Sequence, residues 1–108
     1  IKTSTSHEIT RMLTKAVDTA LLDGTLKKEH YSIAAKTGTA QQVVEGKYSE
    51  TEFLHTFFGY FPSYDPKFIV FLAVRNPQGE QYASRTLTRP FMQIVEFLIN
   101  YYEVPPDR

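Results

Sequence analysis

The sequence predicts an α+β fold in which a three-stranded antiparallel sheet is flanked by an N-terminal and a C-terminal amphipathic helix. Two observations carry this prediction. Apolar residues recur at helical spacing near both ends of the chain, and the middle holds three stretches rich in β-branched and aromatic residues, separated by turn formers. The 108 residues, 42% of them hydrophobic, suffice for one globular domain or for a piece of a larger one.

Residues 6–22 are expected to form the first helix. Its apolar residues fall three and four positions apart, which places them on one face: Ile9, Met12, Leu13, Ala16, Val17, Ala20 and Leu21. Thr5 and Glu8 have the spacing of a capping box at the start of this helix. Asp23 and Gly24 supply the left-handed backbone that commonly ends a helix.

Three strands are expected to follow. Residues 31–40 have small side chains, which suit a strand that a partner approaches closely, and the polar residues 41–52 predict a loop or an extended hairpin. Residues 53–61 carry large apolar side chains at both odd and even positions, as in a strand that is covered on both faces. Residues 67–74 form the most apolar strand, and the turn formers at residues 62–66 predict that the last two strands pair as an antiparallel hairpin.

A second amphipathic helix is expected near the C-terminus, after a polar loop at residues 76–81. Its apolar stripe comprises Phe91, Ile94, Val95, Leu98, Ile99 and Tyr102. Pro90 is tolerated only in the first turn of a helix, and Pro105 and Pro106 prevent its continuation.

Composition excludes several classes of function. The twelve basic and twelve acidic residues cancel, so no nucleic-acid partner is expected, and the absence of cysteine excludes disulfides and thiolate sites. His7, His30 and His55 lie in different expected elements, and no H-E-x-x-H occurs, so we assign no metal and no cofactor. No stretch reaches the roughly 18 apolar residues of a spanning helix, so any membrane anchor is expected to lie outside this chain.

The stretch Lys36-Thr37-Gly38-Thr39 is the candidate functional site. Lys36 offers a compact positive charge, Thr37 and Thr39 offer hydroxyl donors, and Gly38 leaves room for a substrate backbone. These properties suit the binding of an anion and of a peptide backbone. Strand alternation places Lys36 and Thr37 on opposite faces, so both can serve one site only if this is an edge strand whose rim lines the cleft.

Residues 34–41, Ala-Ala-Lys-Thr-Gly-Thr-Ala-Gln, resemble the third active-site motif of penicillin-binding proteins. The resemblance extends to Phe-Phe-Gly-Tyr-Phe-Pro at residues 57–62, to Asp-Pro-Lys at residues 65–67 and to Arg-Pro-Phe at residues 89–91, in the family's order. Residues 1–108 therefore resemble the C-terminal part of a transpeptidase domain of class B, of the division or elongation type. This resemblance implies that the three strands belong to a larger, five-stranded sheet.

The resemblance also implies a function: a serine D,D-transpeptidase that cross-links peptidoglycan stem peptides ending in D-Ala-D-Ala and that β-lactams acylate. Lys36 would lie beside the serine nucleophile. Thr37 and Thr39 would bind the substrate carboxylate, and the backbone N–H of Thr39 would be one of two oxyanion-hole donors. Gly38 would let the substrate pair along the strand.

Part of the family's pattern is missing from the sequence. The family also uses a serine followed three residues later by lysine, and a Ser-x-Asn element, and neither occurs here. The nucleophile is therefore expected upstream, and this chain alone is expected to be inactive. The full-length protein is expected at the extracytoplasmic face of the bacterial membrane, anchored through an N-terminal segment outside this chain.

The remainder of the transpeptidase domain is also an expected partner. In such domains a strand of that remainder pairs with the far side of the strand that begins at Phe68 and ends at Val74. Without it, this strand would expose an apolar edge, so the isolated chain is expected to dimerise, to swap strands or to aggregate, or else to remain bound to that remainder.

Two alternatives remain open. D,D-carboxypeptidases, serine β-lactamases and β-lactam sensors of the same superfamily use a similar Lys-Thr-Gly strand, and the upstream sequence would separate them from transpeptidases. From a different class, the chain could be a non-catalytic module that binds a peptide or a partner protein along the edge formed by residues 31–40.

Overall fold

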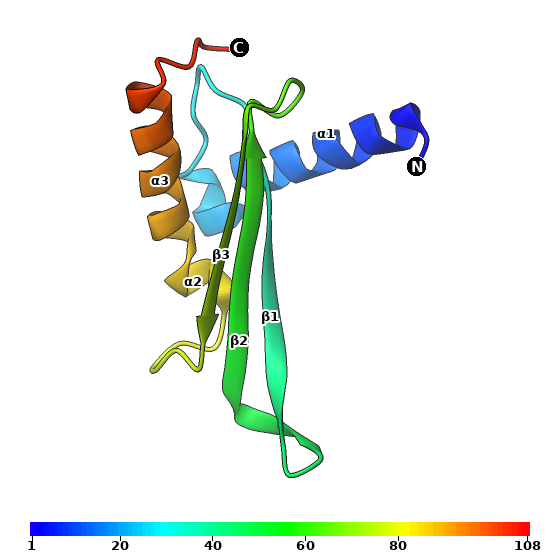
Figure 1. Ribbon diagram of the computed structural model, residues 1–108, viewed down its shortest axis with the longest axis vertical. Coiled ribbons are helices and arrows are strands. Elements are labelled where there is room, and N and C mark those ends of the chain that lie inside the picture. The colour runs from blue at the N-terminus through cyan, green and yellow to red at the C-terminus, as the bar shows by residue number, and fades with distance from the viewer.

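The computed structural model describes residues 1–108 as a three-stranded antiparallel sheet with helices packed against it (Figure 1). The elements are α1 (Thr3–Thr19), the 3₁₀ turn η1 (Leu21–Gly24), β1 (Ala34–Val44), β2 (Lys47–Phe61), β3 (Phe68–Arg75), α2 (Ala83–Thr86) and α3 (Thr88–Tyr101). Both β1 and β3 are edge strands, because each pairs only with β2. The predicted order of helix, three strands and helix is confirmed. No helix combines the length and apolar character that crossing a bilayer requires.

Helix α3 covers one face of the sheet. Its apolar stripe is confirmed at Phe91, Val95 and Ile99, which are buried. Tyr102, the last residue of the predicted stripe, follows the end of the helix and is 58% exposed. The ring centroids of Phe57 on β2 and Phe91 on α3 are 4.4 Å apart. A Cβ atom at Gly59 would collide with the ring of Phe91, so the helix can lie this close to β2 only because residue 59 has no side chain.

The opposite face of the sheet is largely open. Tyr60 and Ile69 are cross-strand partners on this face, as are Phe58 and Phe71. Ile69 is 69% exposed and Phe71 is 62% exposed. Helix α1 covers only the end of the face, where the hydroxyls of Thr10 and Tyr60 lie 2.7 Å apart. The expectation that β2 is covered on both faces is therefore correct for the α3 face and wrong, within this chain, for the other.

The capping box predicted at the start of α1 is wrong. The helix begins two residues before Thr5, and no side chain caps its first turn. Glu8 instead accepts hydrogen bonds of 2.9 and 2.6 Å from the guanidinium of Arg11, and these hydrogen bonds lower the pKa of Glu8. The left-handed backbone predicted at Asp23 and Gly24 is confirmed, with φ of 56° and 75°, but it lies in η1 and does not end α1, which ends at Thr19.

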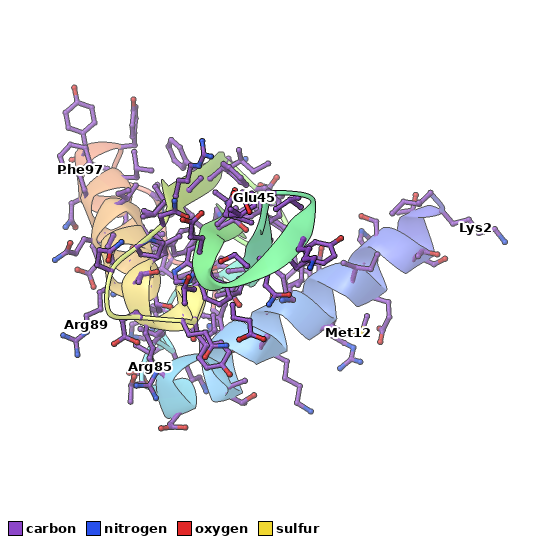
Figure 2. All side chains as sticks on the ribbon, turned by 90° about the horizontal axis from the view of Figure 1, so that it is seen from below. Lys2, Met12, Glu45, Arg85, Arg89 and Phe97 are labelled. Carbon is purple, nitrogen blue, oxygen red and sulfur yellow. The ribbon has the colours of Figure 1, made fainter.

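The buried face of α1 also differs from the predicted apolar stripe. Thr10, Thr14 and Val17 are buried, whereas Ile9 is 40% exposed and Met12 is 51% exposed. The N-terminal half of α1 projects away from the sheet, so its apolar residues find no partner in this chain (Figure 1). Met12 points into solvent when the molecule is seen from below (Figure 2).

The polar stretch between the first two strands is an extended hairpin, one of the two structures predicted for it. β1 continues through this stretch to Val44, and β2 begins at Lys47. Glu45 and Gly46 make the turn with positive φ of 50° and 76°. Both strands are exposed near this turn, which is why their composition is polar.

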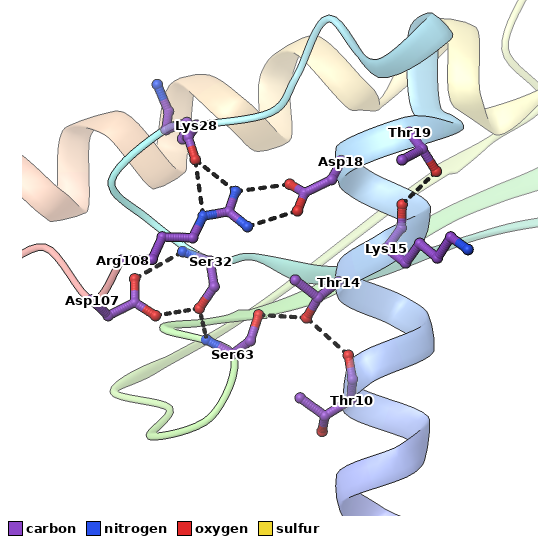
Figure 3. Close-up of polar contacts among 10 residues, drawn as sticks. All are labelled: Thr10, Thr14, Lys15, Asp18, Thr19, Lys28, Ser32, Ser63, Asp107 and Arg108. Carbon is purple, nitrogen blue, oxygen red and sulfur yellow. Dashed lines mark hydrogen bonds and ion pairs between the residues drawn. The ribbon is translucent and has the colours of Figure 1, made fainter.

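The last two residues of the chain connect α1 with the strand ends, and we call them the C-terminal clasp (Figure 3). Asp107 accepts hydrogen bonds from the backbone N–H of Ser32, at 2.8 Å, and from its hydroxyl. The guanidinium of Arg108 donates to both carboxylate oxygens of Asp18, at 2.6 and 2.8 Å, and also to the carbonyl of Lys28. The hydrogen bond to Asp18 raises the pKa of Arg108 above its ordinary value.

We predict that the isolated chain associates through β3. The outer edge of this strand has no partner, and its open face exposes Ile69 and Phe71. Size-exclusion chromatography with light scattering should show dimers or larger species at micromolar concentration. Phe71→Lys should shift the population toward monomer, whereas Val43→Lys, at an equally exposed apolar residue near the β1–β2 turn, should not. A wild-type chain that stays monomeric would contradict this prediction.

Candidate functional site

The Lys-Thr-Gly-Thr stretch lies on β1, the outermost strand on one side of the sheet. Lys36 and Thr39 are exposed, and Thr37 and Gly38 are half-buried. All four residues are thus accessible on a strand that has a neighbour on one side only. This is the placement that the sequence predicted for a strand whose rim binds a ligand.

The strand register assigns the four side chains to two faces. Lys36 is opposite Phe58 on β2, and Thr39 is opposite His55. Because cross-strand partners share a face, Lys36 lies on the open face, whereas Thr37 and Thr39 lie on the face that α3 covers. The lysine and the hydroxyls therefore occupy opposite faces, as strand alternation predicted, and only the edge between them is common to both.

The ammonium of Lys36 lies along the strand. Its Nζ atom donates a 2.6 Å hydrogen bond to the backbone carbonyl of Thr37. Backbone groups of residues two apart point to the same edge of a strand, so the N–H of Thr39 points to the edge at which this carbonyl meets the ammonium. A ligand at that edge could meet one fixed N–H donor and one positive charge.

The hydroxyl of Thr39 has a partner that the sequence did not predict. The backbone N–H of Ala83, the first residue of α2, donates to it at 3.0 Å. With one lone pair of Oγ1 occupied, the hydroxyl keeps its proton free to donate to an anionic acceptor. Helix α2 thus orients this hydroxyl from the protein side.

Gly38 has a structural reason for being glycine in addition to the predicted one. A Cβ atom at this position would collide with the hydroxyl of Thr56, which lies across the strand pair and 3.4 Å from the carbonyl of Gly38. The missing side chain therefore makes room for Thr56 as well as for any ligand that approaches the strand.

His55 is fully buried beneath this stretch, and its role was also not predicted. Both ring nitrogens are hydrogen-bonded, at 2.8 Å to the hydroxyl of Thr86 and at 2.7 Å to the carbonyl of Gln81. A signal for its burial was present in the sequence, because His55 has the same strand parity as the buried Phe53 and Phe57. The chain brings no three histidine or acidic side chains together in an arrangement that could hold a metal ion.

Comparison with known proteins agrees with the resemblance seen in the motif. Residues 1–96 match the family described as the penicillin binding protein transpeptidase domain. Stage V sporulation protein D of Bacillus subtilis is 34% identical over 90 residues, which are 81% of this chain and 14% of that protein. A peptidoglycan D,D-transpeptidase FtsI homolog of Chlorokybus atmophyticus is 31% identical over 106 residues, which are 94% of this chain and 16% of that protein. The chain thus spans less than a fifth of the length of these relatives.

Solved structures share the fold. The transpeptidase domain of Burkholderia pseudomallei penicillin-binding protein 3 aligns with a TM-score of 0.77 and 26% identity, over 97% of this chain and 32% of that one. Penicillin-binding protein 3 of Mycobacterium tuberculosis, solved in complex with ampicillin, aligns with a TM-score of 0.79 and 24% identity, over 99% of this chain and 26% of that one. The sheet and its flanking helices are therefore an incomplete α+β fold of the transpeptidase type. Together with the match over residues 1–96, this shows that the chain belongs to the penicillin-binding protein transpeptidase family.

Proposed function

We propose that this chain is part of a serine D,D-transpeptidase, in which it supplies the strand that binds the carboxylate end of a peptidoglycan stem peptide or of a β-lactam. The observation that carries the proposal is the accessible Lys-Thr-Gly-Thr stretch on edge strand β1, where the Lys36 ammonium and the Thr39 N–H lie at one edge. The names of the relatives support the reaction, since one of them is a peptidoglycan D,D-transpeptidase FtsI homolog.

Each group in the stretch has a chemical role in this proposal. The positive charge of the Lys36 ammonium attracts the anionic substrate, and the ammonium helps to position the protons that move at the serine. The hydroxyls of Thr37 and Thr39 donate to the carboxylate. The N–H of Thr39 donates to the oxyanion of the tetrahedral intermediate, where loss of one donor typically costs about 2.7 to 4 kcal/mol. Peptidoglycan lies outside the cytoplasmic membrane, so we place the full-length protein on the extracytoplasmic face.

Labelling of the full-length protein with fluorescent penicillin tests the proposal. Lys36→Ala and Thr39→Val are each expected to slow acylation by about tenfold or more, because each removes a charged or charge-assisted contact from the site. Lys15→Ala, at an exposed lysine of α1, is the matched control and should leave the acylation rate unchanged. Normal acylation of both β1 variants would refute the proposed role of this strand.

The isolated chain provides a second arm of the same experiment. No serine in the sequence has lysine at the third following position, so the chain lacks the family's pairing of nucleophile and base. It should therefore remain unlabelled at penicillin concentrations that saturate the full-length protein. Covalent labelling of the isolated chain would show that the nucleophile lies within these 108 residues.

A further inference from the structure

A buried histidine connects β2 with the segment that contains α2. His55 has no exposed surface. Its Nε2 atom lies 2.7 Å from the carbonyl oxygen of Gln81, and its Nδ1 atom lies 2.8 Å from the hydroxyl of Thr86. Gln81 precedes α2 and Thr86 is its last residue, so one side chain holds the segment at both ends.

The hydrogen-bond roles follow from the chemistry of the partners. A carbonyl oxygen can only accept, so Nε2 carries a proton and donates it to Gln81. Nδ1 lies 2.8 Å from the Thr86 hydroxyl, whose Oγ1 also lies 3.3 Å from the carbonyl oxygen of Ala83. Both ring nitrogens thus have a partner, and replacement by an apolar ring would remove both hydrogen bonds.

The segment held by His55 reaches the candidate site directly. Ala83 lies between Gln81 and Thr86, and its N–H donates to the hydroxyl of Thr39 at 3.0 Å. Thr39 is also the cross-strand partner of His55, so the histidine and the threonine lie on the same face of adjacent strands. Movement of the segment would withdraw the N–H that orients the hydroxyl.

We propose that His55 is a positioning residue, which holds Ala83 so that the Thr39 hydroxyl presents its proton to the substrate carboxylate. This inference rests on the proposed function, because it gives Thr39 the same ligand. His55 touches no substrate. It acts through the hydrogen bonds to Gln81 and Thr86 and then through Ala83.

A double-mutant cycle in the full-length protein tests the inference, with the rate of acylation by fluorescent penicillin as the readout. His55→Phe keeps the ring but removes both hydrogen bonds, and it is expected to slow acylation by about tenfold. In a Thr39→Val background the same substitution should cost less than about twofold, because the hydroxyl that it positions is already gone. The loss should appear in the concentration of penicillin that gives half-maximal rate.

Two further variants keep the test decisive if His55→Phe folds poorly. Thr86→Val removes the partner of Nδ1 together with the 3.3 Å hydrogen bond from this hydroxyl to the carbonyl of Ala83, and it should show a smaller loss with the same dependence on Thr39. His55→Gln has an amide that can donate to Gln81 in place of Nε2, and it should recover most of the rate. Thr14→Val is the matched control, since it removes a buried hydroxyl that lies 2.8 Å from Ser63 at the other end of β2. It should lower stability without slowing acylation.

The outcomes separate this inference from the proposed function. If Thr39→Val slows acylation but the His55 and Thr86 variants do not, Thr39 keeps its role and the positioning by His55 is refuted. Positioning is refuted as well if His55→Phe costs the same in both backgrounds, because the effect then bypasses Thr39. If Thr39→Val itself has no effect, the proposed carboxylate contact fails together with the inference.

Discussion

Phe91→Ala is expected to lower the free energy of unfolding by about 3 to 5 kcal/mol, the usual range for removing a fully buried phenylalanine from a core. The side chain has no exposed surface, and its ring lies against Phe57 and over Gly59. Since Gly59 has no side chain, it cannot fill the space that the ring leaves. The substitution should therefore leave a cavity between α3 and the sheet rather than a repacked core.

Urea titration followed by circular dichroism measures this loss, at concentrations where wild type and variant have the same oligomeric state. Phe97→Ala is the matched control, because Phe97 lies on the outer side of the same helix and is 61% exposed (Figure 2). It should change stability by less than about 1 kcal/mol. Equal losses for the two variants would mean that α3 does not pack through the face described above.

The sequence predicted α3 more accurately than α1, and the reason lies in what each helix contacts. α3 buries Phe91, Val95 and Ile99 against the sheet. The spacing of apolar residues in its sequence therefore predicts the buried face correctly. α1 buries Thr10 and Thr14, whose hydroxyls reach partners 50 and 49 residues away in the chain. Such contacts leave no periodic signal, and the apolar residues Ile9 and Met12 of α1 point where this chain offers no partner.

The candidate site, like the fold, could be predicted from the sequence only in part. A cation, hydroxyls and glycine at consecutive positions identified residues 36–39, and small neighbouring side chains placed them on a strand. The partners of Thr39 were not predictable, because they depend on α2 folding back onto β1 from more than 40 residues away. The alternation of buried and exposed residues along β2 indicated that His55 is buried. Only the fold shows that its two ring nitrogens form hydrogen bonds with Gln81 and Thr86.

The C-terminal clasp leads to the second prediction, that Asp107→Ala costs about 3 kcal/mol of stability. Its carboxylate accepts two hydrogen bonds from Ser32, which is almost fully buried. Hydrogen bonds to charged groups contribute about 1.5 to 3 kcal/mol each, and removal of the carboxylate leaves the N–H of Ser32 unpaired. The effect should extend to α1, because the Ser32 hydroxyl also accepts a 2.9 Å hydrogen bond from Ser63, whose hydroxyl lies 2.8 Å from that of Thr14 (Figure 3).

Asp65→Ala is the matched control for the clasp. Asp65 forms an ion pair with Lys67 at 2.8 Å, but its side chain is 83% exposed, so its removal should cost less than about 1 kcal/mol. Hydrogen exchange distinguishes the two further: Asp107→Ala should increase exchange along the C-terminal half of α1, and Asp65→Ala should not. If α1 exchanges equally slowly in both variants, the helix is held by its contacts with Tyr60 and the core alone, and the clasp fixes only the chain end.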